Sequence, residues 1–515
     1  MTRERMESFS ELSQFELDPA SIQLLSKSFC ERERCVVLGR VDPTSKTAVT
    51  VGLLDPRNAQ VVATIEKRLG RDVKAVGLNG YEIDRALAEG FGGGAPPEKS
   101  AREVPRIDLR SAPARDGASP SQLFDDLLAH GLAKGASDIH LECYEDDVDV
   151  RLRIDGVLHQ LQTPVSPANV KQVVSRIKIL ADLDIAERRR PLDGRIEVVV
   201  VDGGGKTRDV DLRVSTLPGL DGEDVVIRIL DPSMGLLSIA DLGMSEGVAT
   251  QFAALLDNPE GMVLVTGPTS SGKTTTLSAA VCRLRDHHRK VITAEDPIEI
   301  RIPKVNQKQV DKNLTMADLA RAFLRQNPDV MLIGEIRDLV TADTATKAAS
   351  TGHLVLGTLH TADAFGAITR LRALGVENWD IAEALLGCVS QRLVRRICAS
   401  CRVEAPPSDS QRALFGARLE GITASRGAGC ERCFGSGYKG RTGIYELLVV
   451  DEQLQDRIAD GVNTSDLRAA ARRAGFHGLL EDALAKVAAG ATSLDEVVRV
   501  LPYRQLRAAA ASLSP

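Results

Sequence analysis

The segment 267–274 constrains this chain more than any other feature of its 515 residues. It fits the pattern G-x-x-x-x-G-K-[ST], with an apolar run (262–265) before it and a helix-compatible run (275–281) after it. A strand, glycine loop and helix in this order bind nucleotide phosphates, because backbone N–H groups of the loop turn toward phosphate oxygens. A fortuitous glycine-rich loop is the alternative, but accident rarely supplies the strand and the helix as well. The sequence therefore predicts a nucleotide-binding domain.

The residues predicted to bind the nucleotide are those of the loop and the start of the helix after it. Lys273 is expected to contact the β and γ phosphates, and the Thr274 hydroxyl is expected to ligate Mg²⁺. The complete predicted set is Gly267, Pro268, Thr269, Ser270, Ser271, Gly272, Lys273, Thr274 and Thr275.

Length and composition restrict the class of protein. A chain of 515 residues exceeds one compact core, so two to four domains are expected, and 43% hydrophobic residues favour folded domains over disorder. A net charge of −6 with only 3% aromatic residues argues against a dedicated nucleic-acid binder. The first residues lack an apolar signal region, and no run approaches about 18 uncharged apolar residues. The expected location is the cytoplasm, without direct membrane insertion.

Four of the nine cysteines form two Cys-x-x-Cys pairs, a spacing typical of structural zinc sites. The pairs are Cys398 with Cys401 and Cys430 with Cys433, and 28 residues (402–429) separate them. Together they supply four thiolates, the ligand set of a tetrahedral Zn²⁺ ion. Redox-active pairs and unligated thiols are the alternatives.

Breaks in the hydrophobic pattern divide the first part of the chain. Residues 1–90 read as a small α/β module, with a strand near 48–54 and a helix that Asn58 caps. Residues 91–118 contain a glycine and proline run, followed by serine, alanine, proline and charged residues without an apolar period. This composition predicts a flexible linker.

The second part of the chain changes pattern once more. Short alternating strands dominate residues 119–231, and a second linker is predicted at 232–243. Residues 244–515 alternate strands and helices around the phosphate-binding loop. This alternation predicts a mostly parallel sheet with helices on both faces.

Two acidic segments follow predicted strands downstream of the loop. Glu295 follows the strand-like run 291–294, and Glu335 follows Gly334 after the run 330–333. Nucleotide hydrolases use one carboxylate to orient or deprotonate the attacking water and another to hold the metal ion. An ordinary phosphate-loop enzyme places aspartate directly after the second strand, where this chain has Gly334. The metal role is therefore assigned to Glu335 by inference.

Further segments extend this pattern. In the second half of the chain they are an aspartate box (293–299), the run 325–330, a Walker B run ending in 334–338 and a histidine box (351–361). Upstream they are 136–142, 153–156, 193–195 and 211–216. Taken together, about residues 119–500 resemble the hexameric secretion ATPases of bacterial type II secretion and type IV pilus assembly. The tetracysteine insertion resembles that of the extension and assembly branch of this family.

The resemblance implies a multidomain α/β architecture. The N-terminal α/β module would serve in docking, residues 119–231 would form a PAS-like α+β domain, and residues 244–515 would form a RecA-like P-loop ATPase domain. The ATPase domain would carry a zinc-binding insertion at 396–440 and C-terminal helices at 444–515.

The resemblance also implies roles for the acidic and histidine boxes. Glu295 would activate the attacking water, and Glu335 would act on the metal ion. His353 and His360 would sense the γ phosphate and relay its loss. Satisfied structural histidines are the alternative for the last two.

Five arginines match positions with roles in this family. Arg213 and Arg228 match positions that reach the nucleotide of a neighbouring subunit, and Arg321, Arg325 and Arg337 match charge-compensating or interface positions. An arginine supplied by a neighbour stabilises the departing phosphoryl group and makes catalysis depend on assembly. Solvated surface charges are the alternative.

The implied function is a hexameric motor that hydrolyses Mg-ATP to power pilus or pseudopilus assembly. The expected partners are ATP, further copies of the chain, an inner-membrane platform protein and a docking protein at the cytoplasmic membrane. The chain would thus associate peripherally with the inner membrane through partners. The expected cofactors are Mg²⁺ and Zn²⁺. A nucleotide-dependent scaffold without turnover and a DNA-uptake or translocation motor remain as alternatives.

Overall fold

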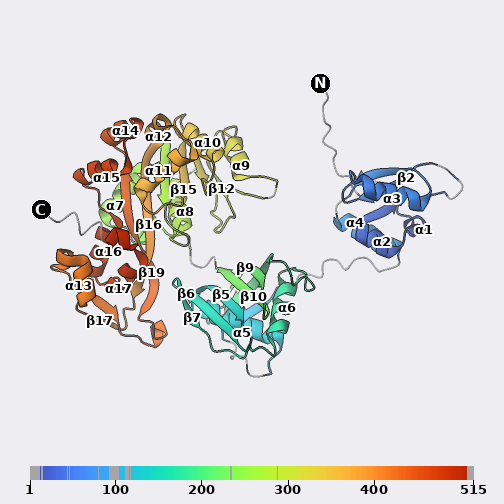
Figure 1. Cartoon of the computed structure of the whole chain (residues 1–515), viewed down its shortest axis with the longest axis horizontal. Coiled ribbons are helices and arrows are strands. Elements are labelled where there is room, and N and C mark those ends of the chain that lie inside the picture. The colour runs from blue at the N-terminus through green and yellow to red at the C-terminus, as the bar shows by residue number, and fades with distance from the viewer. Residues whose placement is uncertain are drawn as a thin grey trace. The chain divides into compact units, whose positions relative to one another are not determined.

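The computed structural model describes residue 12 and residues 15–42, 45, 47–78, 80–91, 104–110, 115, 117–231, 235–286, 288–311 and 313–506. The chain divides into two compact units, residues 1–104 and residues 105–515. Figure 1 gives the labels of the helices and strands. Their mixture confirms the predicted α/β, multidomain fold class.

The first unit is a three-stranded sheet with helices packed on it. Its strands are β1 (Cys35–Leu38), β2 (Val49–Leu53) and β3 (Val73–Gly77), with β2 antiparallel to β1 and parallel to β3. Its helices are α1 (Pro19–Ile22), α2 (Lys27–Glu33), α3 (Ala59–Leu69) and α4 (Gly80–Gly90). Asn58 caps α3 as predicted, because its side-chain oxygen accepts a hydrogen bond from the Val61 amide at 3.2 Å.

The second unit begins with a mostly antiparallel sheet in the order β4-β8-β9-β10-β5-β6-β7. The strands are β4 (Arg106–Asp108), β5 (Ala136–Cys143), β6 (Val148–Ile154), β7 (Val157–Gln160), β8 (Leu192–Val201), β9 (Thr207–Pro218) and β10 (Glu223–Leu230). Helices α5 (Pro120–Ala133) and α6 (Val170–Leu180) share its apolar core. Ser119 begins α5 with both hydrogen bonds of a capping box.

The predicted linker over residues 91–118 is too long. Strand β4 lies within it and pairs parallel to β8, with Arg106 opposite Val199. Ile107 is buried in the core of this sheet, and one apolar residue in a three-residue strand leaves no periodic signal in a sequence. Residues 92–103, 111–114, 116 and 232–234 of the two predicted linkers lie outside the described residues. The other predicted domain boundaries stay predictions.

The third sheet has the order β13-β12-β14-β15-β11-β16-β19. All of its strands run parallel except β19 at one edge. They are β11 (Gly261–Thr266), β12 (Val291–Glu295), β13 (Asn306–Gln309), β14 (Val330–Ile333), β15 (Leu354–Leu359), β16 (Leu385–Ile397) and β19 (Tyr438–Val449). Strands β11, β14 and β15 are buried along their whole length, as expected where helices cover both faces of a parallel sheet.

Helices pack on both faces of this sheet (Figure 1). One face carries α9 (Met316–Phe323), α10 (Leu339–Ala349), α11 (Ala364–Leu374), α12 (Asn378–Ala384), α14 (Glu452–Ala459) and α15 (Thr464–Arg473). The other carries α7 (Glu246–Leu256), α8 (Lys273–Leu284) and the 3-10 helix η3 (Ile239–Leu242). Strand β11 serves both cores, because Met262 and Leu264 face one and Val263 and Val265 face the other.

A smaller core lies beside the tetracysteine segment. It contains side chains from α13 (Asp409–Phe415), α16 (Leu479–Ala488) and α17 (Leu494–Val500). The segment itself holds a hairpin of β17 (Arg402–Glu404) and β18 (Ser425–Gly427), with the 3-10 helices η4 (Gly416–Leu419) and η5 (Glu431–Cys433).

The carboxyl ends of the parallel strands lie side by side and form the carboxyl edge of the third sheet. Ala294 on β12 pairs with Ile333 on β14, and Thr266 at the end of β11 pairs with Leu359 on β15. The segments that follow these strands therefore emerge side by side. This is the edge at which open α/β sheets bind ligands.

A buried carboxylate ties two helix starts to the antiparallel edge strand. Glu446 on β19 is 3% exposed, and its oxygens accept hydrogen bonds from the backbone N–H groups of Ala364 at 2.7 Å and Leu479 at 3.2 Å. These residues begin α11 and α16, where amides have no partner within the helix. Burial raises the pKa of Glu446 to about 7, against the opposing effect of these amides.

This raised pKa predicts a pH-dependent stability. The protonated carboxyl is favoured in the folded chain, so its contribution is complete below about pH 4.5 and is lost as the pH rises through about 7. We expect Glu446→Gln, which stays neutral, to gain about 2 to 3 kcal/mol on the wild type between pH 5 and pH 8. Urea unfolding of both chains across this range measures the difference. A difference that does not change with pH would contradict the assignment.

Candidate functional site

The phosphate-binding loop lies between β11 and α8, as the motif predicts. Gly272 is the N-cap of α8 with φ +89°, and Gly267 has φ +150°, so both motif glycines adopt conformations that side chains disfavour. The Lys273 ammonium donates to the carbonyl oxygens of Gly267 and Pro268, both at 3.0 Å. The loop therefore curves around this ammonium group. The group lies at the amino end of α8, where the helix dipole favours anions.

The pKa of the Lys273 ammonium lies below its usual value. Burial lowers the pKa of its ammonium, and the Arg392 guanidinium lowers it further, whereas the carboxylates of Glu335 and Glu299 raise it. A bound phosphate oxygen would place a negative charge beside this buried ammonium and so stabilise its charged form. Thr274 and Thr275 follow in the first turn of α8 and are only partly buried.

Glu335 and His360 meet at the carboxyl edge of the sheet. The Glu335 carboxylate lies 3.4 Å from Nε2 of His360 and 2.6 Å from the Arg337 guanidinium. The hydrogen bond from Arg337 is the main cause that lowers the pKa of Glu335, with His360 and Lys273 adding to it. An ionised carboxylate at this position is a suitable ligand for Mg²⁺, directly or through water.

The glycine that replaces the usual aspartate after β14 has a steric cause. The Gly334 amide donates to the Ala294 carbonyl at 2.8 Å, so the backbones of two neighbouring strands touch here. A Cβ at Gly334 would lie 2.9 Å from that same oxygen. A side chain is therefore excluded, and the first carboxylate available at this edge is that of Glu335.

Glu295 ends β12 at the same edge. Its carboxylate accepts hydrogen bonds from the Thr293 hydroxyl at 2.6 Å and from the Gln307 amide at 2.9 Å. These two bonds fix the orientation of one carboxylate oxygen, Oε1. The side chain is thus held in place at the strand end, as a residue that orients water needs to be.

His353 does not join this group, and its role in sensing the γ phosphate stays a prediction. It precedes β15, whose six residues span about 20 Å, whereas His360 follows that strand. Its ring Nδ1 lies 3.0 Å from the Ala348 carbonyl oxygen, and its own carbonyl accepts from the Gly261 amide at the start of β11. The two histidines of the histidine box therefore lie at opposite ends of strand β15.

Three arginines form a row across the antiparallel sheet. Arg213 on β9 pairs in register with Arg195 on β8 and with Arg228 on β10. Arg228 is held by Asp138 at 2.9 Å, and burial lowers the pKa of the Arg213 guanidinium. Like charges placed directly opposite each other destabilise a sheet unless an anion compensates them. Sequence reasoning gave no role to Arg195, because only strand pairing reveals the row.

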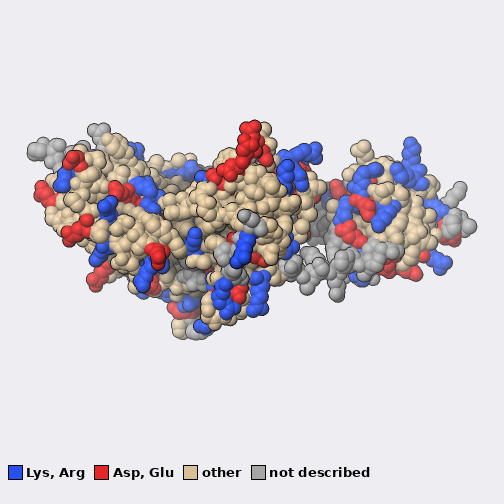
Figure 2. All heavy atoms as spheres, turned by 90° about the horizontal axis from the view of Figure 1, so that it is seen from below, with Lys and Arg blue, Asp and Glu red and all other residues tan. Residues whose placement is uncertain are grey.

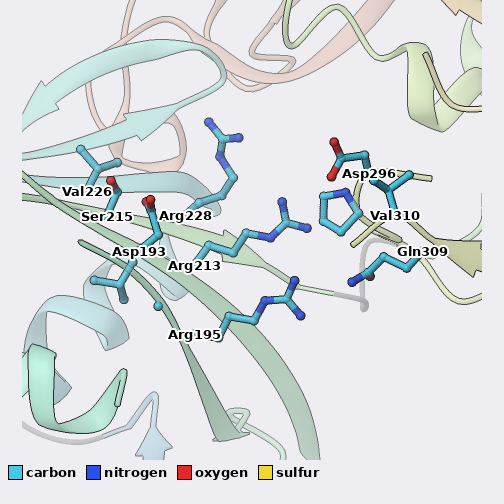
Figure 3. A pocket seen from close by; sticks show the side chains of 12 residues that line it. Asp193, Arg195, Arg213, Ser215, Val226, Arg228, Asp296, Gln309 and Val310 are labelled. Carbon is cyan, nitrogen blue, oxygen red and sulfur yellow. The ribbon is translucent and has the colours of Figure 1, made fainter. Parts of the chain in front are cut away.

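These arginines line a cavity of about 490 Å³. Figure 3 shows Arg195 and Arg213 reaching from the strands toward the side that carries Asp296 and Gln309. Asp296 belongs to the aspartate box and follows Glu295 directly. In this chain the arginine row therefore faces an acidic segment of its own nucleotide domain. The prediction that Arg213 and Arg228 reach a neighbouring subunit stays a prediction.

The four cysteines of the two pairs converge. Their sulfurs all lie within 4.8 Å of one another, with distances of 3.8 Å for Cys398 to Cys430, 3.8 Å for Cys401 to Cys433 and 3.7 Å for Cys430 to Cys433. Sulfurs that surround a Zn²⁺ ion at about 2.3 Å in a tetrahedron lie about 3.8 Å apart. Amide N–H groups of Cys430 and Gly437 also point at the Cys433 sulfur, each at 3.2 Å. The donor set fits a tetrahedral thiolate-bound metal ion.

Acidic and basic side chains are interspersed on the face that Figure 2 shows, and neither sign forms a continuous stripe there. Among the described helices, none has the length and apolar character needed to cross a bilayer.

Comparison with known proteins identifies the relatives of this chain. Residues 114–499 match the family described as "Type II/IV secretion system protein", and residues 8–96 match the "MshEN domain". The chain is 40% identical over 499 residues to "Type IV pilus assembly ATPase PilB" of Thermus thermophilus, and this match covers 93% of the chain but 54% of that relative.

Two further comparisons agree. The chain is 44% identical over 404 residues to "Type II secretion system ATPase E" of Vibrio cholerae, covering 78% of each protein. The solved structure of "the Legionella pneumophila ATPase DotB" shares the fold with a TM-score of 0.56 at 21% identity, over 78% of this chain and 99% of that one. The chain belongs to the type II/IV secretion system family, that of the ATPases of type II secretion and type IV pilus assembly.

Proposed function

We propose that this chain is the hexameric motor that hydrolyses Mg-ATP to power pilus or pseudopilus assembly. The observation that carries the proposal is the convergence of the phosphate-binding loop, Glu335 and His360 at one edge of a parallel sheet. A phosphate cradle next to an ionised carboxylate is the arrangement that phosphoryl transfer requires. Family membership over residues 114–499 supports the same activity.

The residues of the site have separate roles in the proposed hydrolysis. The loop amides and Lys273 bind the β and γ phosphates, and Thr274 with Glu335 would hold Mg²⁺, which neutralises phosphate charge when bound. Glu295, fixed by Thr293 and Gln307, orients or deprotonates the attacking water. His360 contacts Glu335 and is placed to respond when the γ phosphate leaves.

Arginines complete the charge compensation. A departing phosphoryl group carries negative charge, and the guanidiniums of Arg213 and Arg228 suit its stabilisation. We assign these residues to the nucleotide of the neighbouring copy, so that hydrolysis depends on the ring. Arg337 already compensates Glu335 within one chain, and Arg321 and Arg325 belong to the subunit interface in this assignment.

In this proposal the tetracysteine segment binds a zinc ion that crosslinks it. It projects from the end of β16, where Cys398 follows Ile397 directly, and its hairpin of β17 and β18 buries little apolar surface. A metal ion that crosslinks four thiolates stabilises such a segment where a hydrophobic core is small. A rigid projection suits contact with the assembly machinery.

The proposed partners follow from the family. The ring acts on an inner-membrane platform protein, and the N-terminal module binds a docking protein at the cytoplasmic membrane. The chain would then work in the cytoplasm, peripherally associated with the inner membrane. The relatives in Thermus and Vibrio are named for pilus assembly and type II secretion, which supports this class of machine.

Lysine substitution in the loop tests the ATPase activity. Lys273→Ala should leave a folded, metal-containing chain whose phosphate release falls at least about 100-fold. No other loop residue carries a positive charge that could compensate the negative charge of the β and γ phosphates. Lys347→Ala is the matched control, since Lys347 pairs with Asp343 on the surface of α10 and is 66% exposed. Glu295→Gln should lower the rate in the same assay. Full activity in either site variant would exclude the proposed chemistry.

Cysteine substitution tests the zinc assignment. Cys433→Ser should lower bound zinc from about one ion per chain to well below half, because a structural site needs all four thiolates. Metal analysis by mass spectrometry after gel filtration measures the content, and Cys143→Ser is the control outside the cluster. Wild-type zinc content in the Cys433 variant, or none in the wild type, would refute the assignment.

A further inference from the structure

A buried amide contacts the phosphate-binding loop from behind. Gln391 on β16 is 1% exposed, and its Nε2 donates to the Ser271 carbonyl oxygen at 2.7 Å. Its Oε1 accepts from the Thr276 hydroxyl at 2.8 Å. One side chain therefore bonds the loop on one side and the first turns of α8 on the other. Because both partners are buried, losing either bond would leave a polar group unsatisfied.

The loop backbone also lies directly on this residue. A Cβ at Gly267 would come within 2.6 Å of the Gln391 carbonyl oxygen, and a Cβ at Gly272 within 3.1 Å of its Nε2. These are the two glycines that define the phosphate-binding motif. Their lack of a side chain thus allows the loop to rest on Gln391, in addition to allowing amides to face a phosphate.

The next residue continues the contact toward the catalytic edge. Arg392 is 6% exposed, and its guanidinium donates to the Gln391 carbonyl at 3.0 Å and to the Ala362 carbonyl at 2.7 Å. Ala362 lies two residues after His360, whose ring contacts Glu335. Arg392 thus joins the support of the phosphate-binding loop to the segment that carries His360.

We propose that Gln391 and Arg392 are positioning residues for the ATPase reaction. Gln391 holds the phosphate-binding loop in its nucleotide-accepting shape, and Arg392 holds the His360 segment against it. Gln391 acts through the loop backbone and Arg392 through the Ala362 carbonyl. The inference rests on the proposed ATPase function, because it assigns the two residues to separate steps of that reaction.

The separation can be measured with full-length variants. In Gln391→Met, which has similar length and no amide, Mg-ADP should bind about tenfold more weakly by isothermal titration calorimetry, with a parallel rise in KM for ATP. In Arg392→Lys, which keeps the charge but loses the two-pronged donor, kcat should fall about tenfold while the Mg-ADP Kd stays within twofold of wild type.

Ser390→Ala is the matched control on the same strand. Its hydroxyl is buried and has no hydrogen-bond partner among the described residues, so its removal should change neither Kd nor kcat. Gln391→Glu guards against misfolding of the methionine variant. It keeps an acceptor for Thr276 but sets a carboxylate oxygen, which cannot donate when ionised, against the Ser271 carbonyl oxygen, and it should weaken Mg-ADP binding to at least a similar extent.

The outcomes separate this inference from the proposed function. Wild-type Mg-ADP affinity in both Gln391 variants would overturn the role of Gln391, and wild-type kcat in Arg392→Lys would overturn that of Arg392. If the wild type binds Mg-ADP but releases no phosphate in its assembled form, the proposed function fails. Weakened binding in the Gln391 variants would still support the positioning of the loop in that case.

Discussion

The nucleotide site depends on the register of parallel strands in the third sheet. Because Thr266 pairs with both Leu359 and Ser390, the strands β11, β15 and β16 bring the phosphate-binding loop, His360 and Gln391 to one level. The pairing of Ala294 with Ile333 adds Glu295 and Glu335 to the same edge. A slip of one residue would turn the alternating side chains of a strand to the opposite core. The two apolar cores therefore fix the geometry of the polar edge.

Strand β16 connects this edge to the tetracysteine segment. Gln391, near the middle of β16, contacts the phosphate-binding loop, and Cys398 follows the last residue of β16. Between them, Arg395 bonds Glu496 on α17 at 2.9 Å, which anchors the strand to the C-terminal helices. One strand thus touches the nucleotide loop, the C-terminal core and the tetracysteine cluster. Such a strand is a suitable element through which nucleotide state and the projecting segment affect each other.

Local patterns predicted much of this fold. The glycine loop, the apolar strands around it, the capping residues Asn58 and Ser119 and the doubled Cys-x-x-Cys spacing are all short-range signals, and the structure contains each of them. Long-range pairing has no such signal. The row of Arg195, Arg213 and Arg228 depends on which strands are neighbours, and the contact of Gln391 with Ser271 joins residues 120 positions apart. A motif also does not state at which end of a strand each of its residues lies, as His353 before β15 and His360 after it show.

Hydrolysis in the proposed function depends on assembly, because arginines supplied by a neighbouring copy would complete each pocket. The most direct measurement is phosphate release per protomer at saturating Mg-ATP, for rings and monomers separated by gel filtration of the same preparation. The ring is expected to be faster per protomer by at least about tenfold, since a neighbour's arginine strongly accelerates phosphoryl transfer. Equal rates in the two fractions would contradict it.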